Sequence, residues 1–313
     1  MSARLDNLRI IDPILTTLSQ SYTNNTFIGN RLFPIVKVNK TKGKIPVFGK
    51  ESFLVRDTRR ALRANSNRIP TTDFELIDYE TKEYDAEMSM DYLEEREANS
   101  ALKYEQHITR DLNDIMLLNK EKSIADLVQN PANYTSDMKV IIDSTTAFDD
   151  YSNSTDPIQM IRNAMGVVRS KIAKYPNIIV MGVATYNAII NHPTILEKIK
   201  YSGVNKVSLD IIRELVEAEE ILIGESVYTE DGVTFEDVWA DNIILAYVDK
   251  SERQRRSEFN PSFGYTFQLK DKPEIDVYFE NGGKTKIIRN TDNFDIKITS
   301  TDAAFLISNT NHL

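Results

Sequence analysis

The stretch DYLEEREANSALKYEQHITRDLNDIMLLNKEKSIADLVQ, residues 91–129, decides how the rest of this chain is interpreted. It contains no Gly or Pro and stops at Asn130-Pro131, so the pattern predicts one unbroken helix. Asp91 can cap the first turn, and Glu94 can bond back to that cap. At about 1.5 Å per residue the helix would be roughly 58 Å long, which is longer than a small domain is wide.

The apolar residues of this stretch form one narrow stripe. They recur at steps of three and four, and polar or charged residues cover most of the remaining circumference. The stripe consists of Ala101, Tyr104, Ile108, Leu112 and Ile115. Such a helix cannot be buried in one ordinary core, so it either lies over a sheet or forms a coiled-coil arm.

Composition narrows the class of protein. A chain of 313 residues with 41% hydrophobic and 27% charged residues is long enough for two folded domains. The absence of Cys excludes disulfides, thiolate nucleophiles and Cys-rich zinc sites, and three His residues far apart supply a His-based metal site poorly. No run is long and apolar enough for a membrane span, and a net charge of −9 argues against a surface generally coated with nucleic acid. We therefore expect no cofactor, no metal, no membrane contact and a cytosolic protein.

The segments before the helix lack a core of their own. Residues 1–45 are predicted to form an N-terminal arm, with an amphipathic stretch at 10–18 and short extended pieces further on. Residues 46–90 are predicted to form an extended loop, because RALRANSNRIP (60–70) is polar with almost nothing to bury. An arm and a loop of this kind usually lie on another element.

Charge is separated into two neighbouring blocks, because arginines dominate 56–68 and acids dominate 73–97. A charge run usually marks a solvated face, but two opposite blocks on neighbouring elements also allow complementary contacts between copies of the chain. A nucleic-acid patch is a weaker alternative, because interleaved aromatic residues are missing. Trp239 is either a packing anchor or a contact at the rim of an interface. The candidate intersubunit contacts are Arg56, Arg59, Arg60, Arg63, Arg68, Glu83, Glu87, Glu94, Glu95 and Trp239.

Beyond the long helix the pattern is first α/β and then all-β. A helix capped at Thr155 or Asp156, a buried strand at 178–183 and further alternating elements form a layered α/β unit, which we place at residues 151–255. From Gly264 onward the apolar period is two. Residues 91–150 and 256–313 would then form one α+β domain, with a sheet, that the α/β unit interrupts.

The candidate catalytic motifs have simpler interpretations. Gly283-Lys284-Thr285 resembles the end of a phosphate-binding loop, but it follows Asn281-Gly282 between two strands, where a hairpin turn is favoured. Asp149-Asp150 fits a solvated turn better than a carboxylate pair for acid–base chemistry. His192 has no Ser or Cys constellation around it in the sequence. We therefore expect a protein that is not an enzyme.

The order of these parts resembles the major capsid proteins of tailed bacteriophages, which have the HK97-type fold. The likeness covers essentially the whole chain, and its weight comes from the order and spacing of several short motifs. These are FPIVKV (33–38), NPANY (130–134), DPI (156–158), YPNIIVMG (175–182) and HPTI (192–195). The resemblance implies an α+β, HK97-like capsid fold with an N-terminal arm, an extended loop, a long spine helix, an inserted α/β axial domain and a peripheral β-sheet.

The resemblance also implies a virion protein that is synthesised and assembled in the host cytoplasm. Copies would form pentamers and hexamers of an icosahedral head shell that encloses double-stranded DNA without reading its sequence. The 56–68 arginines of one subunit would meet the 73–97 acids, or another acidic face, of its neighbour. A portal protein and decoration proteins are implied partners. Because the arm begins within a few residues of Met1, a separate scaffolding protein is expected.

Two alternatives to a phage head shell stay open. An encapsulin-like compartment shell would use the same fold around protein cargo instead of DNA. A carboxylate-dependent hydrolase, from a different class, would need converging acids in a pocket. Some members of the family that the chain resembles cross-link through Lys and Asn side chains. We do not expect this chemistry here, because no spacing identifies a pair among Lys42, Lys44, Lys50, Asn290 and Asn293.

Overall fold

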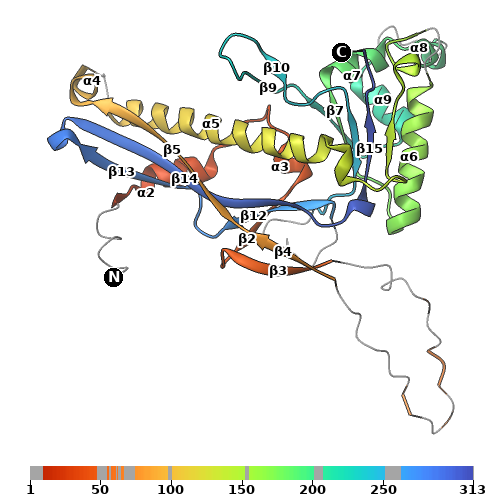
Figure 1. Cartoon of the computed structure of the whole chain (residues 1–313), viewed down its shortest axis with the longest axis horizontal. Helices are drawn as coiled ribbons and strands as arrows, with labels where there is room; N and C mark the ends of the chain where they lie inside the picture. Colours follow the sequence, from red (N-terminus) through yellow and green to blue (C-terminus); the bar gives the residue numbers. More distant parts are fainter. Residues whose placement is uncertain are drawn as a thin grey trace.

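The structure, a computed structural model, describes residues 10–47, 55, 58–60, 62, 65–66, 75–97, 101–151, 155–200, 207–250 and 262–312. The described elements form an elongated body, with a long helix beside a sheet at one end and an α/β unit at the other (Figure 1). Within these residues the strands form a six-stranded sheet, a five-stranded sheet and two two-stranded ribbons. The α+β class predicted from the sequence is confirmed.

The predicted long helix is present as α4 (Tyr92–Glu97) and α5 (Ala101–Gln129), and residues 98–100 lie outside the described residues. The predicted cap is confirmed, because Asp91 Oδ1 accepts from the Leu93 N–H at 2.9 Å and Glu94 Oε2 accepts from the Asp91 N–H at 2.9 Å. With 29 residues, α5 alone is about 43 Å long. It lies along the six-stranded sheet, so the first of the two alternatives for this helix is observed (Figure 1).

The buried stripe of α5 differs from the predicted one toward the end of the helix. Ile108 and Leu112 are buried as expected, but Ile115 is 43% exposed. The stripe continues instead in steps of four through Lys120, Ile124 and Val128. Four-residue steps drift slowly around a helix of 3.6 residues per turn, so the buried face rotates away from Ile115. Polar side chains therefore enter the interior of the protein on this face.

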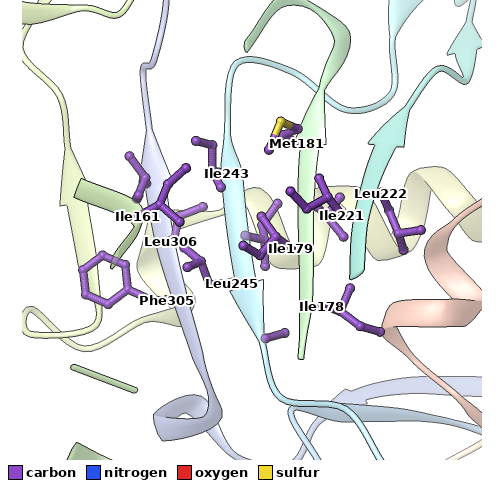
Figure 2. Close-up of a cluster of buried hydrophobic side chains, with 14 of the residues drawn as sticks. Ile161, Ile178, Ile179, Met181, Ile221, Leu222, Ile243, Leu245, Phe305 and Leu306 are labelled. Atoms are coloured by element: carbon purple, nitrogen blue, oxygen red, sulfur yellow. The ribbon is translucent and has the colours of Figure 1, made fainter. Parts of the chain in front are cut away.

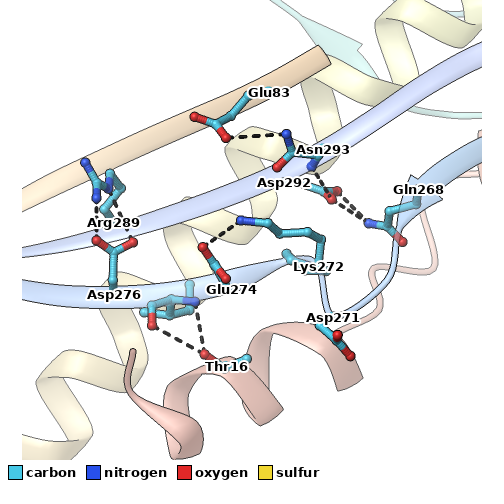
Figure 3. Close-up of polar contacts among 12 residues, drawn as sticks. Thr16, Glu83, Gln268, Asp271, Lys272, Glu274, Asp276, Arg289, Asp292 and Asn293 are labelled. Carbon is cyan, nitrogen blue, oxygen red and sulfur yellow. Dashed lines mark hydrogen bonds and ion pairs between the residues drawn. The ribbon is translucent and has the colours of Figure 1, made fainter. Parts of the chain in front are cut away.

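The central strand of the six-stranded sheet is β14 (Thr285–Ile298). It pairs antiparallel with β13 (Glu274–Glu280), with β12 (Gly264–Leu269) and, on its other side, with β5 (Lys82–Asp91). β13 and β14 are also joined by side chains, because Arg289 donates to its register partner Asp276, at 2.5 Å through Nη2 (Figure 3). The turn between them contains Asn281-Gly282-Gly283, so the hairpin interpretation is confirmed.

β5 corrects the prediction of an extended loop up to residue 90. This strand belongs to the six-stranded sheet, where it pairs with β14 along its whole length. Met90 is buried, and Ala86 and Met88 pack against the same cluster, whereas Glu83, Asp85 and Glu87 are exposed. The sequence contains this alternation, but the high density of acidic residues hides it.

The N-terminal arm adds strands and helices to this sheet. β1 (Ile10–Ile11) pairs with β13, and β2 (Ile35–Val38) pairs in parallel with β12. Between them, α2 (Pro13–Ser21) starts at Asp12, whose carboxylate accepts from the N–H groups of Ile14 and Leu15. Leu15 is fully buried against the sheet and α5. The described part of the arm therefore lies on its own chain.

The α/β unit is built on the five-stranded sheet. Its order is β6 (Lys139–Ile141), β15 (Ala304–Ser308), β11 (Ile243–Ala246), β7 (Ile178–Gly182) and β8 (Glu220–Gly224). Every residue of β7, β11 and β15 is buried. In register, Ile179, Leu245 and Phe305 are neighbours across these three strands and belong to the apolar cluster shown in Figure 2.

β15 and β6 were assigned to the other sheet by the sequence reasoning, and the structure corrects this. β15 (AFLIS) is buried on both faces, and such strands are continuous apolar runs that do not alternate. The alternating period of the preceding strands made it appear part of their sheet. Its pairing with β11 and β6 places the end of the chain inside the α/β unit.

The helix predicted at the start of the α/β unit is confirmed with its cap. α6 (Pro157–Ile172) begins at Asp156, whose Oδ1 accepts from the Ile158 N–H at 3.0 Å. α7 (Val183–Ile190) and α8 (Pro193–Ile199) follow β7, and α9 (Leu209–Val216) begins after Ser208.

Candidate functional site

The loop between β3 (Lys42–Val47) and β4 (Glu75–Glu80) carries the predicted arginines. Arg59 and Arg60 are exposed, whereas Arg56, Arg63 and Arg68 lie outside the described residues. Two apolar residues of the same loop, Val55 and Leu62, are each 96% exposed. The described part of this loop therefore presents both apolar and cationic side chains to solvent.

The base of this loop is fixed to the body by aromatic packing. β3 and β4 form an antiparallel ribbon, and Tyr79 on β4 stacks on Phe267 of β12 with ring centroids 5.0 Å apart. Ile45 is buried in the same cluster. Gly43 leaves room for the ring, because a Cβ there would lie 2.5 Å from Tyr79 Cε1. The position of the ribbon is therefore well defined where the loop leaves the sheet.

Part of the acidic block is neutralised within the ribbon. Lys42 pairs with Glu80 at 2.5 Å, and Lys44 lies 3.9 Å from Asp78. The sequence interpretation of two separate charge blocks missed these pairs, because it did not align β3 with β4. Exposed pairs of this kind contribute little stability, but they reduce the acidic charge that a neighbour would meet.

The predicted acidic contacts on β5 face outward. Glu83 Oε2 accepts from Asn293 Nδ2 at 3.4 Å (Figure 3), and Glu87 Oε2 accepts from the Tyr278 hydroxyl at 2.7 Å. The bond to Glu87, together with burial, raises the pKa of Tyr278 to about 12. Glu94 is engaged in the cap of α4, and the side chain of Glu95 lies outside the described residues. Glu83, Glu87 and Glu94 remain exposed despite these bonds.

Trp239 is a packing anchor, which is the first of its two predicted alternatives. Its side chain is 1% exposed, and its indole Nε1 donates to Glu121 Oε1 at 2.8 Å. Because it is enclosed by its own chain, Trp239 cannot reach a neighbouring copy from this position. Its inclusion among the surface contacts is therefore corrected.

Glu121 connects three parts of the molecule. Its carboxylate accepts from Trp239 of the α/β unit and from the backbone N–H groups of Ile28 (2.9 Å) and Gly29 (2.7 Å) in the arm. Burial raises the pKa of Glu121, and the hydrogen bonds from Trp239 and the arm oppose that shift. Sequence reasoning missed this residue. The available signal was a Glu next to the buried stripe of α5, three residues before the buried Ile124.

The hairpin of β9 (Val227–Tyr228) and β10 (Glu236–Asp237) stands away from the α/β unit (Figure 1). Its tip exposes Val233 by 83% and Phe235 by 74%. The turn is ordered by Asp231, whose Oδ1 accepts from the N–H groups of Val233 and Thr234 at 2.8 and 2.7 Å. These bonds lower the pKa of Asp231 far below its ordinary value. The tip is therefore a fixed apolar projection, which the sequence analysis did not single out.

The candidate catalytic residues have structural roles. His192 is 1% exposed and caps α8, with Nδ1 2.7 Å from Thr194 Oγ1. Asp149 contacts His312, because its Oδ1 lies 2.8 Å from His312 Nδ1.

Among the described residues, no group of three or more His, Cys, Asp or Glu side chains could hold a metal ion. No described helix is long and apolar enough to cross a bilayer.

A pocket of about 780 Å³ lies between the arm, α5 and the six-stranded sheet. Its lining contains five cationic residues and two carboxylates, Asp271 and Asp292. Asp292 is already engaged, because both of its oxygens accept from Gln268 Nε2 at 2.7 Å (Figure 3). This balance of charge does not favour the hydrolase alternative, which requires converging acids.

The chain is similar to known proteins in sequence and in fold. The chain is 41% identical over 309 residues to the major capsid protein of Burkholderia phage BcepMu, covering 98% of this chain and 99% of that protein. It is similar to a phage-related protein from Bordetella bronchiseptica RB50, with a TM-score of 0.82, 28% identity and coverage of 97% and 99%. It is also similar to the capsid of the native GTA particle, with a TM-score of 0.58, 11% identity and coverage of 92% and 91%.

No protein-family model matches the sequence. The similarity to the BcepMu capsid protein is sufficient by itself to assign the family. The 41% identity covers 98% of the chain, from the arm to the final strand. The chain belongs to the family of phage major capsid proteins, and its α+β fold is the HK97-like capsid fold.

Proposed function

We propose that copies of this chain assemble into pentamers and hexamers that close into an icosahedral head shell around double-stranded DNA. The relationship to a phage major capsid protein over 98% of the chain carries this proposal. Two projections support it, the loop with Val55 and Leu62 and the hairpin with Val233 and Phe235. Apolar residues on projections gain free energy when a partner covers them.

Charge complementarity would set the register between copies. Arg59 and Arg60 are exposed on the loop, and Glu83, Asp85 and Glu87 form an outward acidic row on β5. In our proposal, the loop of one subunit reaches the β5 row of its neighbour. Complementary charges of this kind fix orientation and suppress wrong partners more than they add affinity.

The shell would be completed by other phage proteins. We infer a separate scaffolding protein, a portal protein at one vertex and decoration proteins on the outside, with synthesis and assembly in the host cytoplasm. The enclosed DNA would be held without sequence recognition. A compartment shell around protein cargo is less favoured, because the near-full-length relative is a phage capsid protein.

Assembly of the purified full-length chain tests the proposal. Size-exclusion chromatography and negative-stain microscopy should show capsomers, tubes or closed particles. The double variant R59E/R60E should raise the concentration needed for assembly, most strongly at low salt, where charges are screened least. R59K/R60K keeps the charge and is the matched control.

Restoring the charge pattern identifies the partner surface. If the arginines meet the β5 row, E83K/E87K should assemble poorly alone and should recover assembly when mixed with R59E/R60E. Normal assembly of R59E/R60E in both low and high salt would exclude the proposed contact. A compact monomer that never forms a larger particle would exclude the shell. In virions, nuclease-resistant DNA inside the particles distinguishes a head from a compartment filled with protein.

A further inference from the structure

The pocket between the arm, α5 and the six-stranded sheet has the size of a ligand site. Its volume of about 780 Å³ falls within the range of roughly 300–1,000 Å³ that is usual for small-molecule sites in proteins. Each of the three parts contributes a wall. Its polar lining residues include Ser19, Asn113, Lys120, Gln268, Asn290 and Asp292.

The lining has an excess of positive charge. Arg31 and Lys37 come from the arm, Lys120 from α5, and Lys270 and Lys272 from the turn after β12. Lys272 pairs with Glu274 at 2.6 Å (Figure 3). Lys37 donates to Gln268 Oε1 at 2.7 Å. These contacts leave Lys120 as the buried cation that needs an explanation.

Lys120 is 5% exposed, and its Nζ lies 5.0 Å from the centre of the Phe294 ring. Among the described residues, no carboxylate lies within ion-pair distance of this ammonium group. Burial lowers the pKa of Lys120 to about 8, while Asp292 acts to raise it. Asp292 therefore opposes the loss of charge on burial, and a buried ammonium group without a counterion is costly.

A second buried donor lines the same pocket. Asn113 is 4% exposed, and its Oδ1 accepts from Ser19 Oγ and Asn290 Nδ2, both at 2.7 Å. Its Nδ2 has no partner. Asn113 precedes Lys120 by about two turns on the buried face of α5, so both donors come from the same side of one helix.

We propose that this pocket binds an oxyanion, a phosphate or carboxylate group, held by Lys120 Nζ and Asn113 Nδ2. An anion there supplies the missing counterion and the missing acceptor together. Because the surrounding cations come from the arm, α5 and the sheet, the bound anion strengthens the attachment of the arm to the body. The same chemistry has two sources, a free anion from solution or an acidic side chain from a neighbouring copy.

Equilibrium dialysis of the unassembled full-length chain against inorganic phosphate, and separately against acetate, tests the site. At constant ionic strength, the wild type should show one saturable site for at least one of the two anions. K120M should lose it. K103M makes the same substitution at an exposed position of α5 outside the pocket and should retain it.

Further variants keep the test decisive. Circular dichroism checks that K120M folds. If it does not, N113A replaces it and should weaken binding by about tenfold or more, as expected for loss of one hydrogen bond to a charged group. Equal binding by wild type and K120M, or no saturable binding of either anion, would overturn the proposal.

Repeating the dialysis with assembled particles separates the two sources. Binding that persists after assembly identifies a free anion as the occupant. Binding present in the unassembled chain but lost on assembly identifies a carboxylate side chain of a neighbouring copy. Both results support the site, and neither depends on which residues make the other contacts between subunits.

Discussion

The indole N–H of Trp239 donates to Glu121 Oε1 over 2.8 Å, and this contact joins the α/β unit to the long helix α5, as do the hydrogen bonds of Gln129 further along the helix. The same carboxylate accepts two N–H groups from the start of α3 (Gly29–Leu32) in the arm. Three segments that are far apart in the sequence therefore meet at one buried side chain. Its removal should affect the whole molecule.

Replacing Glu121 with Ala should destabilise the protein by about 3 kcal/mol or more, because it leaves three buried N–H donors without an acceptor, at ~1–3 kcal/mol each. Urea unfolding of the unassembled chain measures the change. E121Q keeps one acceptor oxygen and should lose less. E197A, at an exposed position of α8, is the control and should change stability by less than about 0.5 kcal/mol. An E121A midpoint equal to that of the wild type would show that the junction is not needed.

Two glycines of the α/β unit should respond to Ala in opposite ways. A Cβ at Gly182 would lie 2.2 Å from the carbonyl oxygen of Ala240, and a backbone group cannot move aside easily, so G182A should prevent folding or lower the melting temperature strongly. Gly166, inside α6, has nothing within 4 Å of a Cβ. G166A should therefore stabilise the helix by about 0.5–1 kcal/mol. Soluble yield and thermal melting measure both variants, and a G182A protein as stable as the wild type would contradict the geometry.

The contact between His312 and Asp149 should depend on pH. The hydrogen bond to Asp149 raises the pKa of His312. Burial tends to raise the pKa of Asp149, but hydrogen bonds from His312 hold it below its ordinary value. The contribution of His312 is complete below the ordinary His pKa of 6.5 and is lost as pH rises through the raised value. The contribution of Asp149 is lost as pH falls through its lowered pKa.

NMR titration of His312 measures this effect. D149N should bring the pKa of His312 down toward 6.5, whereas D150N, at the adjacent residue, should change it less because Asp150 acts on His312 only through its charge. An unchanged His312 pKa in D149N would show that the contact does not form in solution.

The tip of the β9–β10 hairpin should contribute to assembly without contributing to folding. Val233 and Phe235 are 83% and 74% exposed, so V233S/F235S should leave the melting temperature of the unassembled chain nearly unchanged. In a shell that covers the tip, the same variant should raise the concentration required for particle formation. F235L keeps an apolar tip and should assemble like the wild type. Light scattering during assembly gives the comparison, and equal curves for all three proteins would show that the tip is not an interface.

Local patterns in the sequence predicted the elements well. The caps at Asp91 and Asp156 and the hairpin at Asn281-Gly282-Gly283 are formed by residues close in sequence, and each is present in the structure. The assignment of strands to sheets depends on distant partners, and it was wrong for β6 and β15, while β5 was predicted as part of an extended loop. Periodicity shows which side of a strand is buried, but it does not show which strand lies beside it.

The candidate site was less predictable for the same reason. Charge patterning located Arg59, Arg60, Glu83 and Glu87 on exposed surfaces, but it did not reveal that Lys42 neutralises Glu80 across the ribbon. Glu121 and Lys120 are adjacent charged residues on a polar helix, and only the fold shows that both are buried. Whether the exposed residues meet a neighbouring subunit stays a prediction.

The position of β15 has a consequence for the timing of synthesis. This strand lies in the interior of the five-stranded sheet between β6 and β11, although it follows every other described strand in the sequence. Until β15 has been synthesised, one edge of β11 has no partner, and the sheet is split. A nascent chain that lacks β15 therefore cannot present a finished α/β unit to its sisters. We expect such incomplete subunits to stay out of a growing particle.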